Sequence, residues 1–139
     1  MVKWDKYEAP DSLRYHKEHT WVRTEGEFAF VGLTDFAQQL AGEISYVDLP
    51  EEGDQLVADR PMGKVETGKW VGKLYAPVSG TVEEVNERVL SDPSTINALP
   101  YSSGFLLKVR LATKDAIKGL LDSQGYVAAM QAKKAELKL

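Results

Sequence analysis

The sequence predicts a mainly β fold, a compact antiparallel sandwich or barrel with one short internal helix and helices at its C-terminal end. Three observations lead to this class. Short apolar segments recur at fairly regular spacing with little helical pattern between them, which is typical of antiparallel β proteins. Glycine and proline stand between several of these segments, where turns are needed. Helical periodicity is confined to one short stretch and to the last part of the chain.

Strand patterns fill most of the first two thirds of the chain. We expect strands at residues 19–24, 27–33, 43–49, 55–58, 62–66, 70–75, 80–85 and 104–111. Glu25 and Gly26 provide a two-residue turn between the first two strands, since glycine suits the backbone of tight hairpins. Both alternating faces of residues 27–33 are apolar. This strand is therefore predicted to lie inside the sandwich or barrel.

Two regions have helical patterns. Residues 34–41 form a short helix in which Thr34 acts as the N-cap and Gly42 ends the helix, because both residue types satisfy helix-end requirements. Residues 113–139 are predicted to form the C-terminal helices, broken around Gly125.

The domain organisation follows from these elements. We expect one domain over residues 1–139, since this length suffices for a single core. Residues 1–12 are polar with scattered aromatics and are expected to be a loosely held lead-in, whereas residues 13–111 form the β core. Residues 86–100 are rich in turn-forming residues and predict a long connection with room for a brief helical turn.

Composition excludes several functions. Seventeen basic and 21 acidic residues give a net charge of −4, which argues against a nucleic-acid-binding surface. No apolar run reaches the roughly 20 residues of a membrane span, and the N-terminus lacks the apolar region of a signal peptide. We expect a cytoplasmic protein without a membrane partner, monomeric when free. The chain has no cysteine, so any sulfur redox chemistry must come from an added cofactor.

The stretch from residue 65 to residue 80, VETGKWVGKLYAPVSG, has the pattern of a β-hairpin that presents Lys69 at its tip. Gly68 is placed at the tip because glycine adopts positive φ without steric cost. Pro77 and Gly80 turn the chain into the next strand. By spacing alone, a lysine at such a tip is an ordinary solvated side chain.

Sequence motifs give this lysine a more specific interpretation. The hairpin contains ETGK followed by YAPVSG, and the chain also carries HTWV, VGLTDFAQQLAGE, VDLP with a following GD, and PY before a final LKV. These motifs resemble, in order and in spacing, those of the glycine cleavage system H protein family, whose hairpin has ESVK and YAPVSG. The resemblance covers most of the chain.

The resemblance implies a lipoyl carrier. Lys69 would hold lipoate in an amide bond as N6-lipoyllysine, and Glu66 and Gly80 would be read by the lipoate-attaching enzymes. The implied fold is a barrel-sandwich hybrid, a lipoyl-domain-like β-sandwich. The implied role is that of a non-catalytic subunit, a swinging arm that shuttles an intermediate between enzymes.

Departures from the family pattern bear on the cargo of the arm. Thr20 replaces a glutamate, Lys73 replaces an aspartate, and Leu40 replaces a histidine found in some members. These changes disfavour a protonated aminomethyl group and favour an anionic cargo, because charges about 4 Å apart near a protein surface interact by about 4 kcal/mol. We therefore expect the branch of lipoate-binding proteins that carries sulfur intermediates for heterodisulfide reductase-like complexes in sulfur oxidation. The alternatives are the aminomethyl carrier of the glycine cleavage system, with its enzymes as partners, and a scaffold that is never lipoylated.

No other catalytic or metal site is predicted. His16 and His19 are spaced as His-x-x-His, but a metal site needs at least a third ligand on a defined scaffold. Serine-nucleophile motifs and phosphate-binding glycine loops are also missing from the sequence. The sequence thus favours a carrier over an enzyme.

Overall fold

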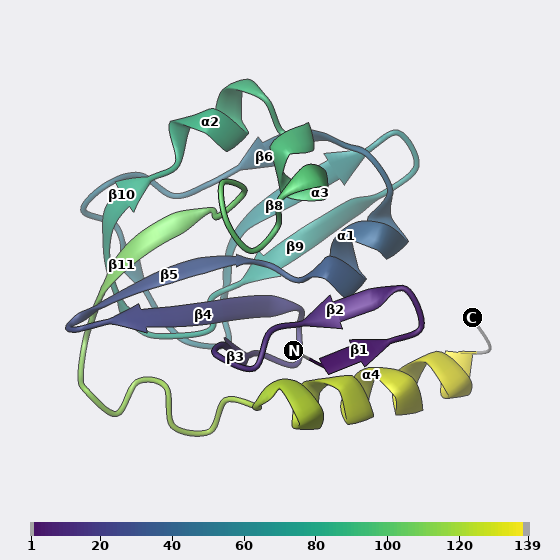
Figure 1. The fold of residues 1–139 in the computed structure, drawn as a ribbon. Coiled ribbons are helices and arrows are strands. Elements are labelled where there is room, and N and C mark those ends of the chain that lie inside the picture. Colours follow the sequence, from purple (N-terminus) through teal and green to yellow (C-terminus); the bar gives the residue numbers. More distant parts are fainter. Residues whose placement is uncertain (1, 138–139) are drawn as a thin grey trace.

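The computed structural model describes residues 2–137, and their side chains through Lys134. Figure 1 shows strands packed in layers, with helices at the periphery. The strands are β1 (Val2–Trp4), β2 (Tyr7–Ala9), β3 (Arg14–Tyr15), β4 (Thr20–Glu25), β5 (Phe28–Leu33), β6 (Ile44–Asp48), β7 (Gln55–Leu56), β8 (Pro61–Thr67), β9 (Val71–Tyr75), β10 (Gly80–Val85) and β11 (Leu107–Leu111). The helices are α1 (Asp35–Ala41), α2 (Glu87–Ser91), α3 (Ser94–Ala98) and α4 (Ser123–Leu137).

The strands form two main sheets and one hairpin. The larger sheet has the order β3-β4-β5-β11-β10-β7, the smaller one has the order β6-β8-β9, and β1 pairs with β2. All of these pairings are antiparallel within the described residues. The predicted mainly β sandwich is confirmed.

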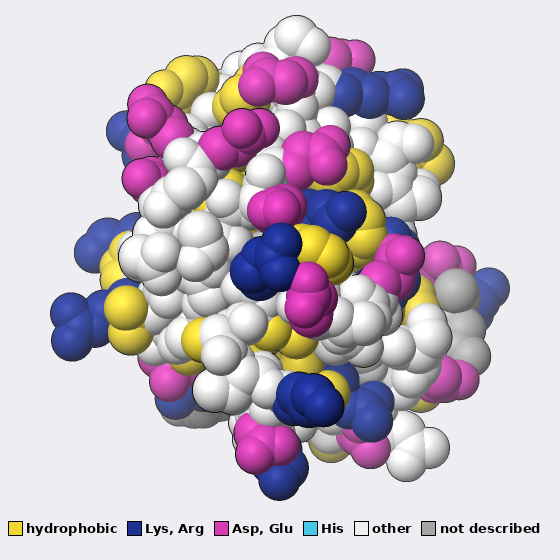
Figure 2. All heavy atoms as spheres, turned by 90° about the vertical axis from the view of Figure 1, so that its left-hand side faces the viewer, with side chains coloured by type: hydrophobic (Ala, Val, Ile, Leu, Met, Phe, Trp, Pro, Cys, Tyr) yellow, Lys and Arg dark blue, Asp and Glu magenta, His cyan; other side chains and the backbone are white. Residues whose placement is uncertain are grey.

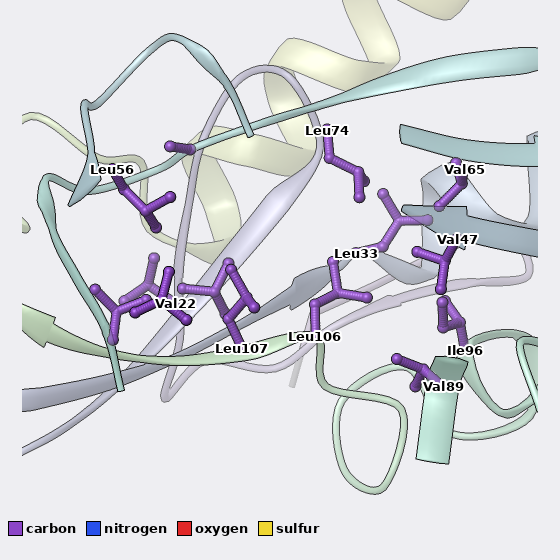
Figure 3. Close-up of a cluster of buried hydrophobic side chains, with 14 of the residues drawn as sticks. Val22, Leu33, Val47, Leu56, Val65, Leu74, Val89, Ile96, Leu106 and Leu107 are labelled. Carbon is purple, nitrogen blue, oxygen red and sulfur yellow. The ribbon is translucent and has the colours of Figure 1, made fainter. Parts of the chain in front are cut away.

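The main core lies between the two large sheets (Figure 3). The larger sheet contributes Val22, Leu33 and Leu107, and the smaller one contributes Val47, Val65 and Leu74, all of them buried. Removing each such side chain from water stabilises the fold by roughly 1.5–3 kcal/mol. The sandwich is therefore held together by apolar contacts from both strands of the β8–β9 hairpin, which positions the tip of that hairpin.

One face of β5 is not buried in the sandwich, although the sequence predicted that both faces are. Phe28 and Phe30 are only half-buried, and cationic side chains lie over them. The Arg23 guanidinium is 4.6 Å from the Phe30 ring centroid, and that of Arg110 is 4.7 Å from the Phe28 centroid. Arginine covers an aromatic face while its charge stays in water, so only one face of β5 belongs to the core.

Charged side chains of both signs cover the surface. Figure 2 shows acidic and basic groups interspersed over the face on the left of Figure 1, with small apolar areas between them. A surface of mixed charge does not produce the broad positive potential that attracts a polyanion such as a nucleic acid.

The short internal helix begins and ends as predicted. The Thr34 hydroxyl accepts a hydrogen bond from the Ala37 backbone N–H at 3.2 Å, and Gly42 ends α1 with φ of 84°. This left-handed conformation favours glycine. Local sequence signals were sufficient here because both caps act within one turn.

The C-terminal region has one helix in place of the predicted pair. Residues 112–119 form bends and turns, Leu121 forms an isolated β-bridge with Tyr15, and Gly119 has φ of 90°, which a continuing right-handed helix does not allow. Helix α4 begins before Gly125, which lies in its first turn, and the Asp122 carboxylate caps this turn by accepting from the Gly125 N–H at 2.7 Å. The last two residues of the predicted helical region, 138–139, lie outside the described residues.

Two other regions are more ordered than expected. The connection over residues 86–100 contains α2 and α3, with Val89 and Ile96 buried. Residues 2–9 form the β1–β2 hairpin rather than a loosely held lead-in. Figure 1 shows this hairpin between α1 and α4. Its buried Tyr7 packs edge-on against Phe36 of α1, with ring centroids 4.8 Å apart.

We predict that Trp4→Ala lowers the free energy of unfolding by about 1–2 kcal/mol, because this truncation removes half-buried aromatic contacts. The Trp4 ring stacks on Phe36 at 5.3 Å and lies 5.4 Å from Lys134 Nζ. Urea unfolding measures the change, with Val57→Ala as control because Val57 is exposed. Equal stability of the two variants would show that the hairpin is not a stabilising brace.

Candidate functional site

Lys69 lies in the turn between β8 and β9, at the end of Figure 1 where α1 lies beside the hairpin. The turn is held by a hydrogen bond from the Thr67 N–H to the Trp70 carbonyl at 2.8 Å and by one from the Lys69 N–H to Thr67 Oγ1 at 3.3 Å. Gly68 does not adopt the expected positive φ. The Lys69 side chain is exposed and makes no ion pair within the described part of the chain. Its amino group is thus presented to a partner on a fixed turn.

An apolar cavity of about 440 Å³ opens beside this lysine. Its lining residues are His19, Ala37, Leu40, Ala41, Lys69 and Trp70. Three of them come from one face of α1, since positions i, i+3 and i+4 of a helix lie together. A cavity of this size is large enough for a small organic group.

His19 is the one residue with a polar, uncharged side chain among those lining the cavity. It has φ of 79°, a conformation that costs energy in a residue other than glycine. Its Nδ1 is 3.0 Å from the Tyr126 hydroxyl, which is 2.8 Å from Thr34 Oγ1. Helix α4 therefore fixes the imidazole through a hydrogen-bonded chain.

The direction of that chain follows from counting donors. The buried Thr34 hydroxyl already accepts from Ala37, and the Tyr126 oxygen is the one acceptor within reach among its described contacts. Thr34 then donates to Tyr126, and Tyr126 donates to His19 Nδ1. In this tautomer the proton of the neutral imidazole is on Nε2. His19 Nε2 has no partner among the described residues and opens to solvent, so it is available as a donor.

Burial lowers the pKa of His19 to about 4, and the charge of Lys133 acts in the same direction. The imidazole is therefore neutral at neutral pH. An unfolded chain takes up this proton near pH 6.5, whereas the folded protein takes it up only near pH 4. Stability must then fall as the pH drops from 6.5 to 4, because the unfolded state binds more protons in that interval.

We predict a loss of up to about 3.5 kcal/mol from this group between pH 6.5 and pH 4, at about 1.4 kcal/mol per pKa unit. Urea unfolding at several pH values measures it, with His19→Gln as the comparison variant, whose acid sensitivity should be smaller. Proton NMR titration assigns the effect, since the chain has only two histidines. A His19 midpoint near 6.5 would contradict the prediction.

Of the three residues expected near the arm, Leu40 lines the same cavity as Lys69, whereas Thr20 and Lys73 are not among the lining residues. Thr20 is fully buried, and its hydroxyl donates to the Tyr75 carbonyl at 3.0 Å. This bond links β4 of the larger sheet to β9 of the smaller one. Lys73 is exposed in β9, opposite Lys64 of β8.

Glu66 and Gly80, the residues expected to guide the attachment enzymes, lie in different sheets. Glu66 is half-buried in β8, and its carboxylate is 3.7 Å from Lys64 Nζ. Gly80 is buried in β10, where a Cβ atom would overlap the Arg110 carbonyl oxygen. This close approach accounts for glycine at position 80 on packing grounds alone.

Sequence reasoning did not identify the other cavity residues. His19 was considered only as a metal ligand together with His16, whose Nε2 instead lies 2.6 Å from Asp59 Oδ1. The described residues contain no group of three or more side chains placed to hold a metal ion. The spacing of Ala37, Leu40 and Ala41 does predict an apolar side of the short helix, but not that this side faces Lys69.

Together, the fold and the site are those expected of a carrier protein: a β-sandwich that presents an exposed lysine beside an apolar cavity. Comparison with known proteins identifies the kind of carrier. The family model described as Glycine cleavage H-protein matches residues 13–133. The chain belongs to this family.

Individual relatives agree with this assignment. The chain is 43% identical over 119 residues to the glycine cleavage system H protein of Geobacillus thermodenitrificans, covering 86% of this chain and 94% of the relative. It is 42% identical over 121 residues to that of Micrococcus luteus, with the same coverage. The crystal structure of a glycine cleavage system H protein from Mycobacterium marinum superposes with a TM-score of 0.82 at 32% identity, covering 88% of this chain and 98% of that one.

Membership defines the general role. The chain is a non-catalytic lipoyl carrier, and the family's cofactor is lipoate in amide linkage to a lysine. The residues present fit this group, because an exposed lysine without an ion pair adjoins an apolar cavity. No helix among the described residues is long and apolar enough to cross a membrane.

Proposed function

We propose that Lys69 carries the lipoyl group and that the chain is the aminomethyl carrier of a glycine cleavage system. The observation that supports this most strongly is the placement of Lys69, exposed at a fixed hairpin tip beside the apolar cavity, in a chain whose relatives are named glycine cleavage system H proteins. Its partners are then a lipoate-attaching enzyme and the glycine cleavage enzymes.

The residues around Lys69 suit this role. Thr67 and Trp70 fix the backbone of the turn, so the lysine stem leaves the scaffold in a defined direction. Acylation removes the charge of Nζ, and the attached group supplies a dithiolane that can carry cargo on sulfur. The sandwich itself need not move, because the reach of the flexible side chain brings the cargo to each partner.

The preference for an anionic sulfur cargo loses its main support. It depended on Thr20 and Lys73 as neighbours of the arm, but Thr20 is turned into the sandwich and bonded to a backbone carbonyl. A glutamate in that orientation would bury a carboxylate at considerable cost. Lys73 is in solvent on the outer face of β9, where screening reduces its effect to about 0–1 kcal/mol. The relatives favour the glycine cleavage role.

The test is reconstitution with glycine decarboxylase and aminomethyltransferase. We predict that the lipoylated protein supports exchange of the glycine carboxyl group, and that Lys73→Asp changes the rate less than about threefold, since screened surface charges contribute little. The H protein of Geobacillus thermodenitrificans serves as the positive control. If that control is active while this lipoylated chain is inactive, the aminomethyl role is wrong and the sulfur-carrier alternative regains support.

A further inference from the structure

A groove with acidic walls lies on the side of the sandwich away from the Lys69 turn. It has a volume of about 570 Å³ and opens between the loop that follows β6 and the helix α2. Figure 1 shows α2 and β10 on one side of the molecule and the tip of the β8–β9 hairpin on the other. This acidic groove is lined by the apolar side chains of Leu49, Val85 and Leu90 and by Glu51, Glu52 and Glu87.

The floor of the acidic groove is apolar. Leu49 and Val85 are half-buried and pack against the main core. Leu90 is 40% exposed and lies one helical turn after Glu87, on the same side of α2. An apolar side chain that enters the groove from a partner would therefore be removed from water, which favours binding.

Hydrogen bonds hold both walls of the groove. The Gly53 N–H donates to the Val82 carbonyl at 2.8 Å, which joins the loop after β6 to β10. On the other wall, the Asn86 side-chain amide donates to the Phe105 carbonyl at 2.6 Å, and the buried Val89 anchors α2. The groove is thus formed before a partner arrives, which lowers the entropic cost of binding.

Three carboxylates give the groove its negative charge. Glu51, Glu52 and Glu87 make no ion pair within the described part of the chain. The groove has no lysine or arginine among its described lining residues, and the exposed Arg88 of α2 is not one of them. The carboxylates are not grouped to hold a single metal ion, so they suit an extended cation. The upper part of Figure 2 shows acidic side chains beside apolar ones on this side of the molecule.

We propose that the acidic groove docks a basic segment of a partner protein, with an apolar side chain of that segment on the floor and its lysines or arginines against the three glutamates. Opposite charges across an interface speed association and fix the orientation of the partners. A partner docked here leaves the Lys69 turn open, because the two lie on different sides of the molecule. It also stays near that lysine at a raised effective concentration. The inference goes beyond the proposed function, since it requires neither lipoate nor a particular cargo.

Peptide binding followed by backbone-amide NMR tests the proposal. The probe is a short end-blocked peptide of alternating lysine and leucine, and the matched peptide has serine in place of leucine. We expect the lysine–leucine peptide to shift the amide signals of residues 49–52 and 85–90. The lysine–serine peptide should bind at least about fivefold more weakly, because it lacks the apolar anchor. Equal binding of the two peptides, or shifts spread over the whole acidic surface, would overturn the proposal.

Charge variants separate the groove from the net charge of the protein. Glu51→Gln with Glu87→Gln should weaken binding of the lysine–leucine peptide about three- to tenfold. The control, Glu18→Gln with Glu43→Gln, changes the net charge equally at two glutamates outside the groove that make no ion pair within the described chain. Its effect should stay within about twofold, since salt screens distant charges. Equal losses in both variants would show nonspecific attraction and reject the docking site.

The leucine on α2 provides a second matched pair. Leu90→Gln should weaken binding of the lysine–leucine peptide about threefold or more, whereas Leu99→Gln, at a leucine that is 44% exposed outside the groove, should not. Shifts of the groove amides on concentrating the protein without peptide would assign the groove to a second copy of the chain and overturn the proposal. Because the peptides are titrated into protein without lipoate, failure of docking leaves the proposed function standing, and failure of glycine exchange leaves docking standing.

Discussion

Lys69→Arg is expected to abolish lipoyl attachment and all carrier activity, while the midpoint of thermal unfolding stays within a degree or two of the original. The guanidinium remains protonated at neutral pH and cannot be acylated as an amine can. Stability is preserved because Lys69 is exposed and makes no ion pair within the described chain. Intact-protein mass spectrometry after co-expression with a lipoate-attaching enzyme measures the adduct.

The neighbouring lysines provide the controls for this experiment. Lys64 and Lys73 lie opposite each other in β8 and β9, on the same hairpin but away from its tip. Lys64→Arg and Lys73→Arg should each retain one adduct. An adduct that survives Lys69→Arg, or that disappears with either control, would assign the attachment to a different residue.

Gly80→Ala is expected to lower the free energy of unfolding by about 3 kcal/mol or more, since overpacking against an immobile group is at the costly end of core substitutions. Gly80 pairs with Leu111 on one side and Leu56 on the other, and the added Cβ would overlap the Arg110 carbonyl and press on Val109. These groups belong to the sheet and cannot rotate away. Urea unfolding measures the loss, with Gly68→Ala as a control that should be nearly neutral.

Comparing Glu66→Gln with Gly80→Ala distinguishes recognition by the attachment enzyme from a packing role, because the two variants should differ in stability. Glu66 makes a partly exposed ion pair with Lys64, so its loss should change stability by only about 0–1 kcal/mol. If lipoylation of this stable variant falls sharply, the enzyme reads Glu66. If Gly80→Ala is as stable as the original but is not lipoylated, the packing explanation is wrong and Gly80 is read directly.

The β1–β2 hairpin shows how an element of this chain supports the site from a distance. It precedes the segment that matches the family model, residues 13–133. The Glu8 N–H donates to Asp35 Oδ2 at 2.9 Å, and Gln39 Nε2 donates to the Lys6 carbonyl at 3.0 Å. These bonds hold α1 in place from one side, and the opposite face of α1 lines the cavity. The hairpin therefore supports the cavity without contributing a lining residue to it.

The sequence by itself determined the features that depend on near neighbours in the chain. Alternation of apolar residues identified most strands, and the caps of α1 were evident at Thr34 and Gly42 because each acts within one turn. The hairpin that presents Lys69 was also predictable, since its turn residues lie between two strand patterns. The motifs around it identified the family, which the comparisons confirm.

The tertiary structure alone decided which residues meet at the site. His19 reaches the cavity because Tyr126, more than a hundred residues later, holds its ring, and α1 comes to the hairpin only through folding. Thr20 is turned inward although it follows His19 directly, because His19 lies just before β4 with φ of 79°, whereas Thr20 begins the strand and its hydroxyl donates to the Tyr75 carbonyl. The motifs around Lys69 thus predicted the kind of cofactor, whereas the directions of the side chains in the folded protein decided which groups surround Lys69.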